Sequence, residues 1–212
     1  DEAWDITTGS RDVIIAVADT GLRLDHEEFQ DNVWQNDDSV NGSDDDQNGY
    51  VDDFRGWDFI NHDNDPFDTS GHGSHVAGII AAGFDNGVGI AGMCDGTIMP
   101  LQVFSGGSGT WEAIAEAITY AVDNGANVLN YSGGGFGGHG LLEQAVQYAH
   151  DNDMTLVAAT GNHGTDTPYY PAAYPGTIAV SGTGANDMYY TSSGRGAYVD
   201  VAAPGMTIWS VG

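Results

Sequence analysis

Short runs of apolar, β-forming residues alternate with segments of helical periodicity along most of this 212-residue chain. The first run, Val13–Ala18, is continuous, as in strands that are buried on both faces of a sheet. Trp111–Asn124 has apolar residues at helical spacing and stops at Gly125, a typical residue at a helix C-terminus. Strands that alternate with helices predict an α/β fold, a doubly wound, mostly parallel sheet with helices on both faces.

The same alternation continues to the end of the chain. It predicts helices at His72–Gly83 and Leu141–Asn152, and strands at Thr97–Phe104, Asn127–Tyr131, Thr155–Ala159, Thr177–Ser181 and Tyr198–Ala202. No repeat or linker interrupts it, so we expect a single domain over residues 1–212. In such sheets ligands bind at the carboxyl ends of strands. Asp19, Ser132 and Asn162 each fall at or just past a predicted strand end, which favours a shared site there.

The charge balance excludes some classes of partner. The chain has 31 acidic residues against four arginines and a formal net charge of −27. This charge repels nucleic acids and anionic membrane surfaces, so we expect neither as a partner. It also calls for bound cations or a salty medium. The single cysteine, Cys94, rules out an internal disulfide and is expected to be a buried, inert thiol.

Three side chains suggest nucleophilic catalysis. A serine hydroxyl is a poor nucleophile and needs a base to take its proton during attack. His72, at the predicted helix start, could be that base, while Asp19 would hold its other ring nitrogen and stabilise the imidazolium. Asn162, in a turn after a strand, could donate to the negative oxygen of the reaction. Taken singly, each residue has a structural alternative: a capping or packed histidine for His72, a turn aspartate before glycine for Asp19, and an asparagine in a left-handed turn for Asn162.

An acid-rich stretch indicates a cation site. Residues 37–68 contain eleven aspartates. The segment from Asp44 to Asp53 matches the first half of an EF-hand loop, with Gly49 at its sixth position and Arg55 where the closing glutamate belongs. Calcium binds six to eight hard oxygens, which clustered aspartates supply. The expected ligands are Asp44, Asp46, Asn48, Tyr50, Asp52 and Asp53. The alternative is a solvated acidic loop.

Several separated motifs, in this order, resemble the subtilases, the subtilisin-like serine proteases, from about Trp4 to the last residue. They are Val17-Ala18-Asp19-Thr20-Gly21, Gly71-His72-Gly73-Ser74-His75-Val76-Ala77-Gly78, Asn130-Tyr131-Ser132-Gly133-Gly134, Ala158-Ala159-Thr160-Gly161-Asn162, Tyr174-Pro175 and Asp200-Val201-Ala202-Ala203-Pro204-Gly205. The resemblance implies a serine endopeptidase that hydrolyses peptide bonds through an Asp-His-Ser triad, with Asp19, His72 and Asn162 as its catalytic residues here.

The family's Gly-Thr-Ser-Met-Ala segment, which carries the nucleophile, should follow Gly205 closely and is absent. We therefore expect a domain truncated at both ends, a serine beyond Gly212, and a chain that is inactive or nearly so by itself. The resemblance implies secretion, a polypeptide substrate, and a propeptide or the missing C-terminal segment as partner. The alternatives are an inactive pseudoprotease that keeps its peptide groove, and a calcium-binding acidic module without protease function.

The resemblance also implies binding residues. Substrate would lie against Ser132, Gly133, Gly134, Ala159, Thr160, Gly161 and Tyr169. Tyr169 stands where a small residue is frequent in the primary side-chain pocket, so its phenol should shorten that pocket or offer a hydroxyl at its base. Further calcium ligands would be Asp58, Asp63, Asp65 and Asp68; Phe84, Asn86, Val88 and Ile90, with Glu28 possible; and Ala172, Tyr174, Thr177 and Asp200.

Overall fold

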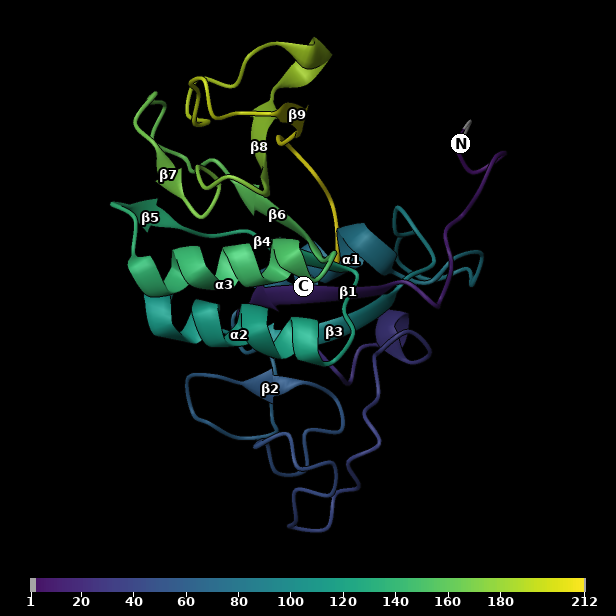
Figure 1. Cartoon of the computed structure of the whole chain (residues 1–212). Helices are drawn as coiled ribbons and strands as arrows, with labels where there is room; N and C mark the ends of the chain where they lie inside the picture. Colours follow the sequence, from purple (N-terminus) through teal and green to yellow (C-terminus); the bar gives the residue numbers. More distant parts are fainter. Residues whose placement is uncertain (1–2, 212) are drawn as a thin grey trace.

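The computed structural model describes residues 3–211, so both ends of the domain predicted over 1–212 lie outside the described residues. Its main sheet contains β1 (Ile14–Asp19), β2 (Trp57–Asp58), β3 (Thr97–Gln102), β4 (Val128–Tyr131), β6 (Thr155–Ala159), β8 (Thr177–Thr183) and β9 (Val201–Pro204). These seven strands run parallel in the order β2-β3-β1-β4-β6-β8-β9 (Figure 1). The predicted parallel sheet is confirmed.

Helices cover both faces of the sheet, as predicted. Helix α1 (His72–Ala81) lies on one face, and α2 (Trp111–Asp123) and α3 (Gly140–Asp151) lie side by side on the other (Figure 1). Single 3₁₀ turns occur at Glu27–Phe29 and Ala185–Asp187. None of the helices described within residues 3–211 has the length and apolar character needed to cross a bilayer.

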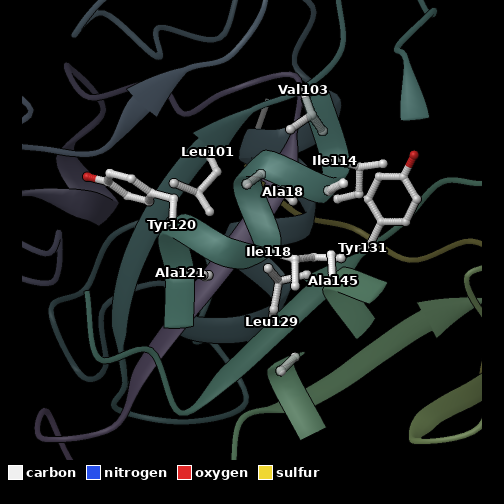
Figure 2. Packing of buried hydrophobic residues seen from close by; sticks show 14 of the residues in the cluster. Ala18, Leu101, Val103, Ile114, Ile118, Tyr120, Ala121, Leu129, Tyr131 and Ala145 are labelled. Atoms are coloured by element: carbon white, nitrogen blue, oxygen red, sulfur yellow. The ribbon is translucent and has the colours of Figure 1, made fainter. Parts of the chain in front are cut away.

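The alternation of side chains along β1 explains why the core consists of two apolar clusters, one on each face of the sheet. Ile15 and Val17 belong to the cluster beneath α1, whereas Ala16 and Ala18 belong to the larger cluster beneath α2 and α3. Successive side chains of a strand point to opposite faces. Figure 2 shows Ile118 of α2 among these larger-cluster residues. Burial of each such large apolar side chain contributes about 1.5–3 kcal/mol.

The strand order has a reversal point beside β1. After β1 the chain moves to β2 and β3 at one edge, then returns through α2 to β4 on the other side of β1. The connection direction therefore reverses between β1 and β4, and such points are where ligands bind in open α/β sheets. Asp19 ends β1 and Ser132 directly follows β4, so both lie at this position.

Several boundaries differ from the prediction. The last strand is Val201–Pro204 and not Tyr198–Ala202, and all four of its residues are exposed. An exposed edge strand lacks the buried apolar run on which the prediction depended. Strand β2, and the antiparallel pair of β5 (Gly135–Phe136) with β7 (Tyr169–Tyr170), were not predicted. Two residues are too few to display a periodicity.

Candidate active site

The end of β1 and the start of α1 bring an aspartate and a histidine together. Asp19 is fully buried, and its Oδ1 lies 2.6 Å from Nδ1 of His72. The same oxygen accepts the backbone N–H of Thr20 at 2.8 Å. The His72 side chain is 56% exposed. The buried carboxylate thus orients one ring nitrogen, while the ring itself remains open to solvent.

Asp19 also sets the protonation behaviour of this histidine. Its hydrogen bond raises the pKa of His72 above the ordinary value, and the negative charges of Asp19 and Asp68 act in the same direction against the opposing effect of burial. The protonated imidazole is therefore stabilised. A general base needs this property, because it must carry a proton in the transition state.

A second buried carboxylate fixes the first turn of α1. Asp68 accepts the hydroxyls of Thr20 at 2.9 Å and Ser74 at 2.7 Å. Backbone N–H groups of Ser70, Gly71 and Ser74 also donate to it. Burial alone would raise the pKa of Asp68, but the hydrogen bonds lower it below the ordinary range. This residue, predicted as a metal ligand, directs both oxygens to the protein.

Asn162 lies three residues beyond β6, exposed, on a cavity of about 280 Å³. His72 lines another cavity of about 370 Å³. Ser132 lines both, so the histidine and the asparagine flank the end of β4. The predicted substrate residues divide between the two: Ala159, Thr160 and Gly161 line the first, and Gly133, Gly134 and Tyr169 line the second.

The ring of Tyr169 lies between the two glycine segments. Its hydroxyl donates to the carbonyl oxygen of Gly134 at 2.6 Å. A Cβ on Gly134 would lie 2.4 Å from the carbonyl oxygen of Tyr170 and 2.5 Å from the Tyr169 ring, and one on Gly161 would lie 3.1 Å from that ring. At Gly133 a different ring leaves no room for a side chain, since an added Cβ would lie 2.5 Å from the Phe104 ring. These glycines therefore accommodate the protein's own aromatic residues, a reason that the sequence alone does not reveal.

The aspartate-rich loop forms one compact group of carboxylates. Asp38, Asp44 and Asp46 each have a carboxylate oxygen within 4.8 Å of the other two. Within residues 3–211, no other group of three or more His, Cys, Asp or Glu side chains brings its ligand atoms so close together. Asp44 and Asp46 were predicted as ligands, but Asp38 was not. It precedes Asp44 by six residues, outside the EF-hand pattern, so no spacing rule could identify it.

Other predicted ligands of this loop make hydrogen bonds or packing contacts with the protein. The Asn48 side-chain amide donates to Asp46 and Asp53, and the Asp52 carboxylate accepts backbone N–H groups of Asn41 and Gly42. Tyr50 packs its ring against aromatic neighbours that include Trp57 and Tyr120.

Carboxylates of the second predicted cluster accept hydrogen bonds from the protein. Asp58 accepts the backbone N–H of Ile60 and the side-chain amide of Asn61, and Asp63 accepts the N–H of Asp65. Together with Asp68, these carboxylates form no close group of three within the described residues.

Two further predicted sites have hydrogen-bonded acids at their centres. Buried Glu28 accepts from Gly83 and Ile90 and from the side-chain amide of Asn86, so the loop containing Phe84 and Val88 folds around a carboxylate. Asp200 accepts the N–H of Ala179 and lines a cavity of about 410 Å³ with Thr177. Ala172 and Tyr174, which shortly precede Thr177 in the sequence, are buried.

Residues 10–211 match the family model described as the subtilase family, and the chain belongs to that family. It is 42% identical over 211 residues to thermitase of Thermoactinomyces vulgaris, covering 99% of this chain and 68% of that protein. It is 41% identical to the thermophilic serine proteinase of Bacillus sp. strain AK1 and 38% identical to halolysin of Haloferax mediterranei, covering 99% of this chain in both cases. It spans only 48% and 38% of those two relatives.

Solved structures agree with this assignment. A protease from Pseudoalteromonas arctica matches with a TM-score of 0.80 at 29% identity, over 96% of this chain and 65% of the other. The prenylagaramide maturation protease PagA matches with a TM-score of 0.74 at 26% identity, over 99% of this chain and 68% of the other. The fold is therefore subtilisin-like, and the family is one of serine proteases.

Proposed function

We propose that residues 1–212 form an incomplete peptidase domain of a secreted serine endopeptidase. Its triad would consist of Asp19, His72 and a serine outside these residues. The observation that carries the proposal is the 2.6 Å contact between the buried Asp19 carboxylate and the partly exposed His72 ring. Within residues 3–211, no hydroxyl is hydrogen-bonded to that ring, which supports a nucleophile supplied from elsewhere.

The residues present define a sequence of proton movements. His72 takes the serine proton as the serine oxygen attacks the peptide carbonyl carbon, and Asp19 holds the tautomer and stabilises the imidazolium. The Asn162 amide donates to the oxygen that becomes negative. His72 then gives its proton to the leaving amine, which leaves an acyl-enzyme. Water, deprotonated by His72, then attacks the carbonyl carbon of this ester. The serine oxygen leaves and takes the proton back from His72, which releases the acid and restores the serine hydroxyl.

An extended polypeptide would lie against the segments 132–134 and 159–161. Backbone groups there can add the peptide as a further strand, which gives affinity without side-chain selectivity. Selectivity would come from Tyr169, because its ring fills the space between Gly134 and Gly161. We therefore assign a preference for small side chains before the cleaved bond.

Calcium is the proposed cofactor, with carboxylates of the aspartate-rich loop as its ligands. A propeptide or further chain segment would contact the 280 Å³ cavity beside Asn162. Secretion is supported by one relative that is named as extracellular, the halolysin-like serine protease Nep of Natrialba magadii, which is 37% identical to this chain. The net charge of −27 disfavours nucleic acid and membrane partners.

Peptide hydrolysis by the protein extended beyond Gly212 tests the proposal. His72→Ala should lower kcat by about 10⁶, because it removes base and acid together. His75→Ala, one turn further along α1, is the matched control and should retain activity. Asn162→Ala should cost about 10²–10³ in kcat with KM little changed. Undiminished turnover in His72→Ala would refute the proposal, and an inert wild-type protein would indicate a pseudoprotease.

A further inference from the structure

A buried carboxylate oxygen in the aspartate-rich loop has no partner. The Asp38 side chain is 0% exposed. Its Oδ1 accepts the backbone N–H of Asp45 at 2.9 Å, but Oδ2 is buried without any hydrogen-bond donor. A buried charge that is neither paired nor hydrogen-bonded is strongly unfavourable, so such groups usually have a counter-charge or coordinate a metal.

Asp38 does not stand alone. One oxygen of its carboxylate lies within 4.8 Å of oxygens of Asp44 and of Asp46. The ion pairs within residues 3–211 involve Arg11, Arg23, His72 and His139, and none of them reaches this loop. Three carboxylates therefore converge without a basic side chain to offset their repulsion.

Local hydrogen bonds hold two of the three carboxylates in place. Asp44 accepts backbone N–H groups from Asn48 and Gly49, and Asp46 accepts one from Asn48. These bonds use only part of the capacity of the carboxylates, since each oxygen can accept more than one interaction. The loop is thus shaped by its own backbone, and its remaining lone pairs are free for another ligand.

We propose that Asp38, Asp44 and Asp46 bind a calcium ion. Hard oxygen ligands are the coordination that calcium prefers, and backbone carbonyls and water can complete it. This assignment rests on the calcium part of the proposed function and revises the ligands. Asp38 supplies an oxygen from outside the EF-hand pattern, whereas Asp52 is not a ligand.

The site is joined to the core through hydrogen bonds. The side-chain amides of Asn36 and Asn48 each donate to both Asp46 and Asp53. Asp53 in turn accepts the hydroxyl of Tyr120, a fully buried residue of α2, at 2.5 Å. A bound ion would therefore fix the loop against the helix layer, and its loss should be detectable in the stability of the whole fold.

Calcium titration by calorimetry tests the site, with Asp38→Asn compared against the matched variant Asp52→Asn. Asp38→Asn removes a charge but retains the acceptor for Asp45. The Asp38→Asn variant should bind one fewer equivalent of calcium, or its calcium affinity at one site should fall by about tenfold or more, which corresponds to about 1.4 kcal/mol. Asp52→Asn should bind as the wild type does. The comparison isolates this site from any other calcium site in the chain.

Terbium luminescence, excited through the neighbouring aromatic residues, provides a second measurement. The terbium signal should appear in the wild type and in Asp52→Asn, and it should be reduced in Asp38→Asn and Asp44→Asn. Calcium should displace the bound terbium more readily than magnesium does. Circular dichroism checks that each variant is folded. Equal stoichiometry and affinity in Asp38→Asn and the wild type, or loss in Asp52→Asn instead, would overturn the assignment. Neither measurement depends on turnover, so failure here leaves the protease proposal intact.

Discussion

The hydroxyl of Thr20 donates to Asp68 at 2.9 Å and accepts the backbone N–H of Gly73 at the same distance. Thr20 follows Asp19 in the chain, and Gly73 follows His72. One hydroxyl and one carboxylate thus connect the end of β1 to the start of α1. The distance between Asp19 and His72 is therefore set by neighbours as well as by the contact between the two.

Asp68→Ala should destabilise the fold by about 3 kcal/mol, because hydrogen bonds to a charged group contribute about 1.5–3 kcal/mol each. The pKa of Asp68 is lowered in the folded state. Its contribution is therefore present above the unfolded-state pKa of about 3.9 and is lost as the pH falls through the folded-state value. Urea unfolding of Asp68→Ala and the wild type at pH 7 and pH 3 measures both effects. Equal stability at pH 7 would contradict this role.

The pH dependence of activity should reflect the raised pKa of His72. His72 must be neutral to act as a base, so kcat/KM should rise with pH through a value above the ordinary pKa of about 6.5. The stability contribution has the opposite sign: it is full below the unfolded-state pKa and is lost as pH rises through the folded-state value. Asp19→Asn should shift the His72 titration downward, as followed by NMR of the ring protons. An unshifted titration would contradict the pairing.

Tyr169→Gly should open the primary side-chain pocket. We expect kcat/KM for substrates with Phe before the cleaved bond to rise by about tenfold or more relative to those with Ala. Tyr169→Phe is the control, because it keeps the ring and removes only the hydrogen bond to Gly134. It should keep the preference for small side chains. A wild-type protein that prefers Phe and is unaffected by Tyr169→Gly would refute the assignment.

Salt should stabilise the chain. A net charge of −27 is self-repulsive, and the screening length falls from about 30 Å at 0.01 M salt to about 3 Å at 1 M. Tm should rise between these concentrations of sodium chloride, with chelator present to exclude bound calcium. Sucrose serves as the control, because it favours the compact state without screening charge. A Tm that does not respond to sodium chloride would show that the charges are already balanced.

The sequence was sufficient for the parallel sheet because buried strands such as β1 must be continuously apolar. It also predicted the Asp19–His72 pair, because the two residues have the chemistry of a base with its orienting acid and stand in motifs that resemble those of the subtilases. The contribution of Asp38 could not be predicted, because its proximity to Asp44 depends on the path of an irregular loop. The reason for Gly134 was also hidden, because it depends on the position of Tyr169, 35 residues further along the chain.

Labelling with a fluorophosphonate, followed by mass spectrometry, tests the central claim most directly. In the protein extended beyond Gly212, we expect one labelled serine, located outside residues 1–212, and no labelling in His72→Ala. The 212-residue chain alone should remain unlabelled. Stoichiometric labelling of Ser132, Ser192 or Ser193, or labelling that persists in His72→Ala, would contradict an Asp19–His72 couple acting on a serine from another segment.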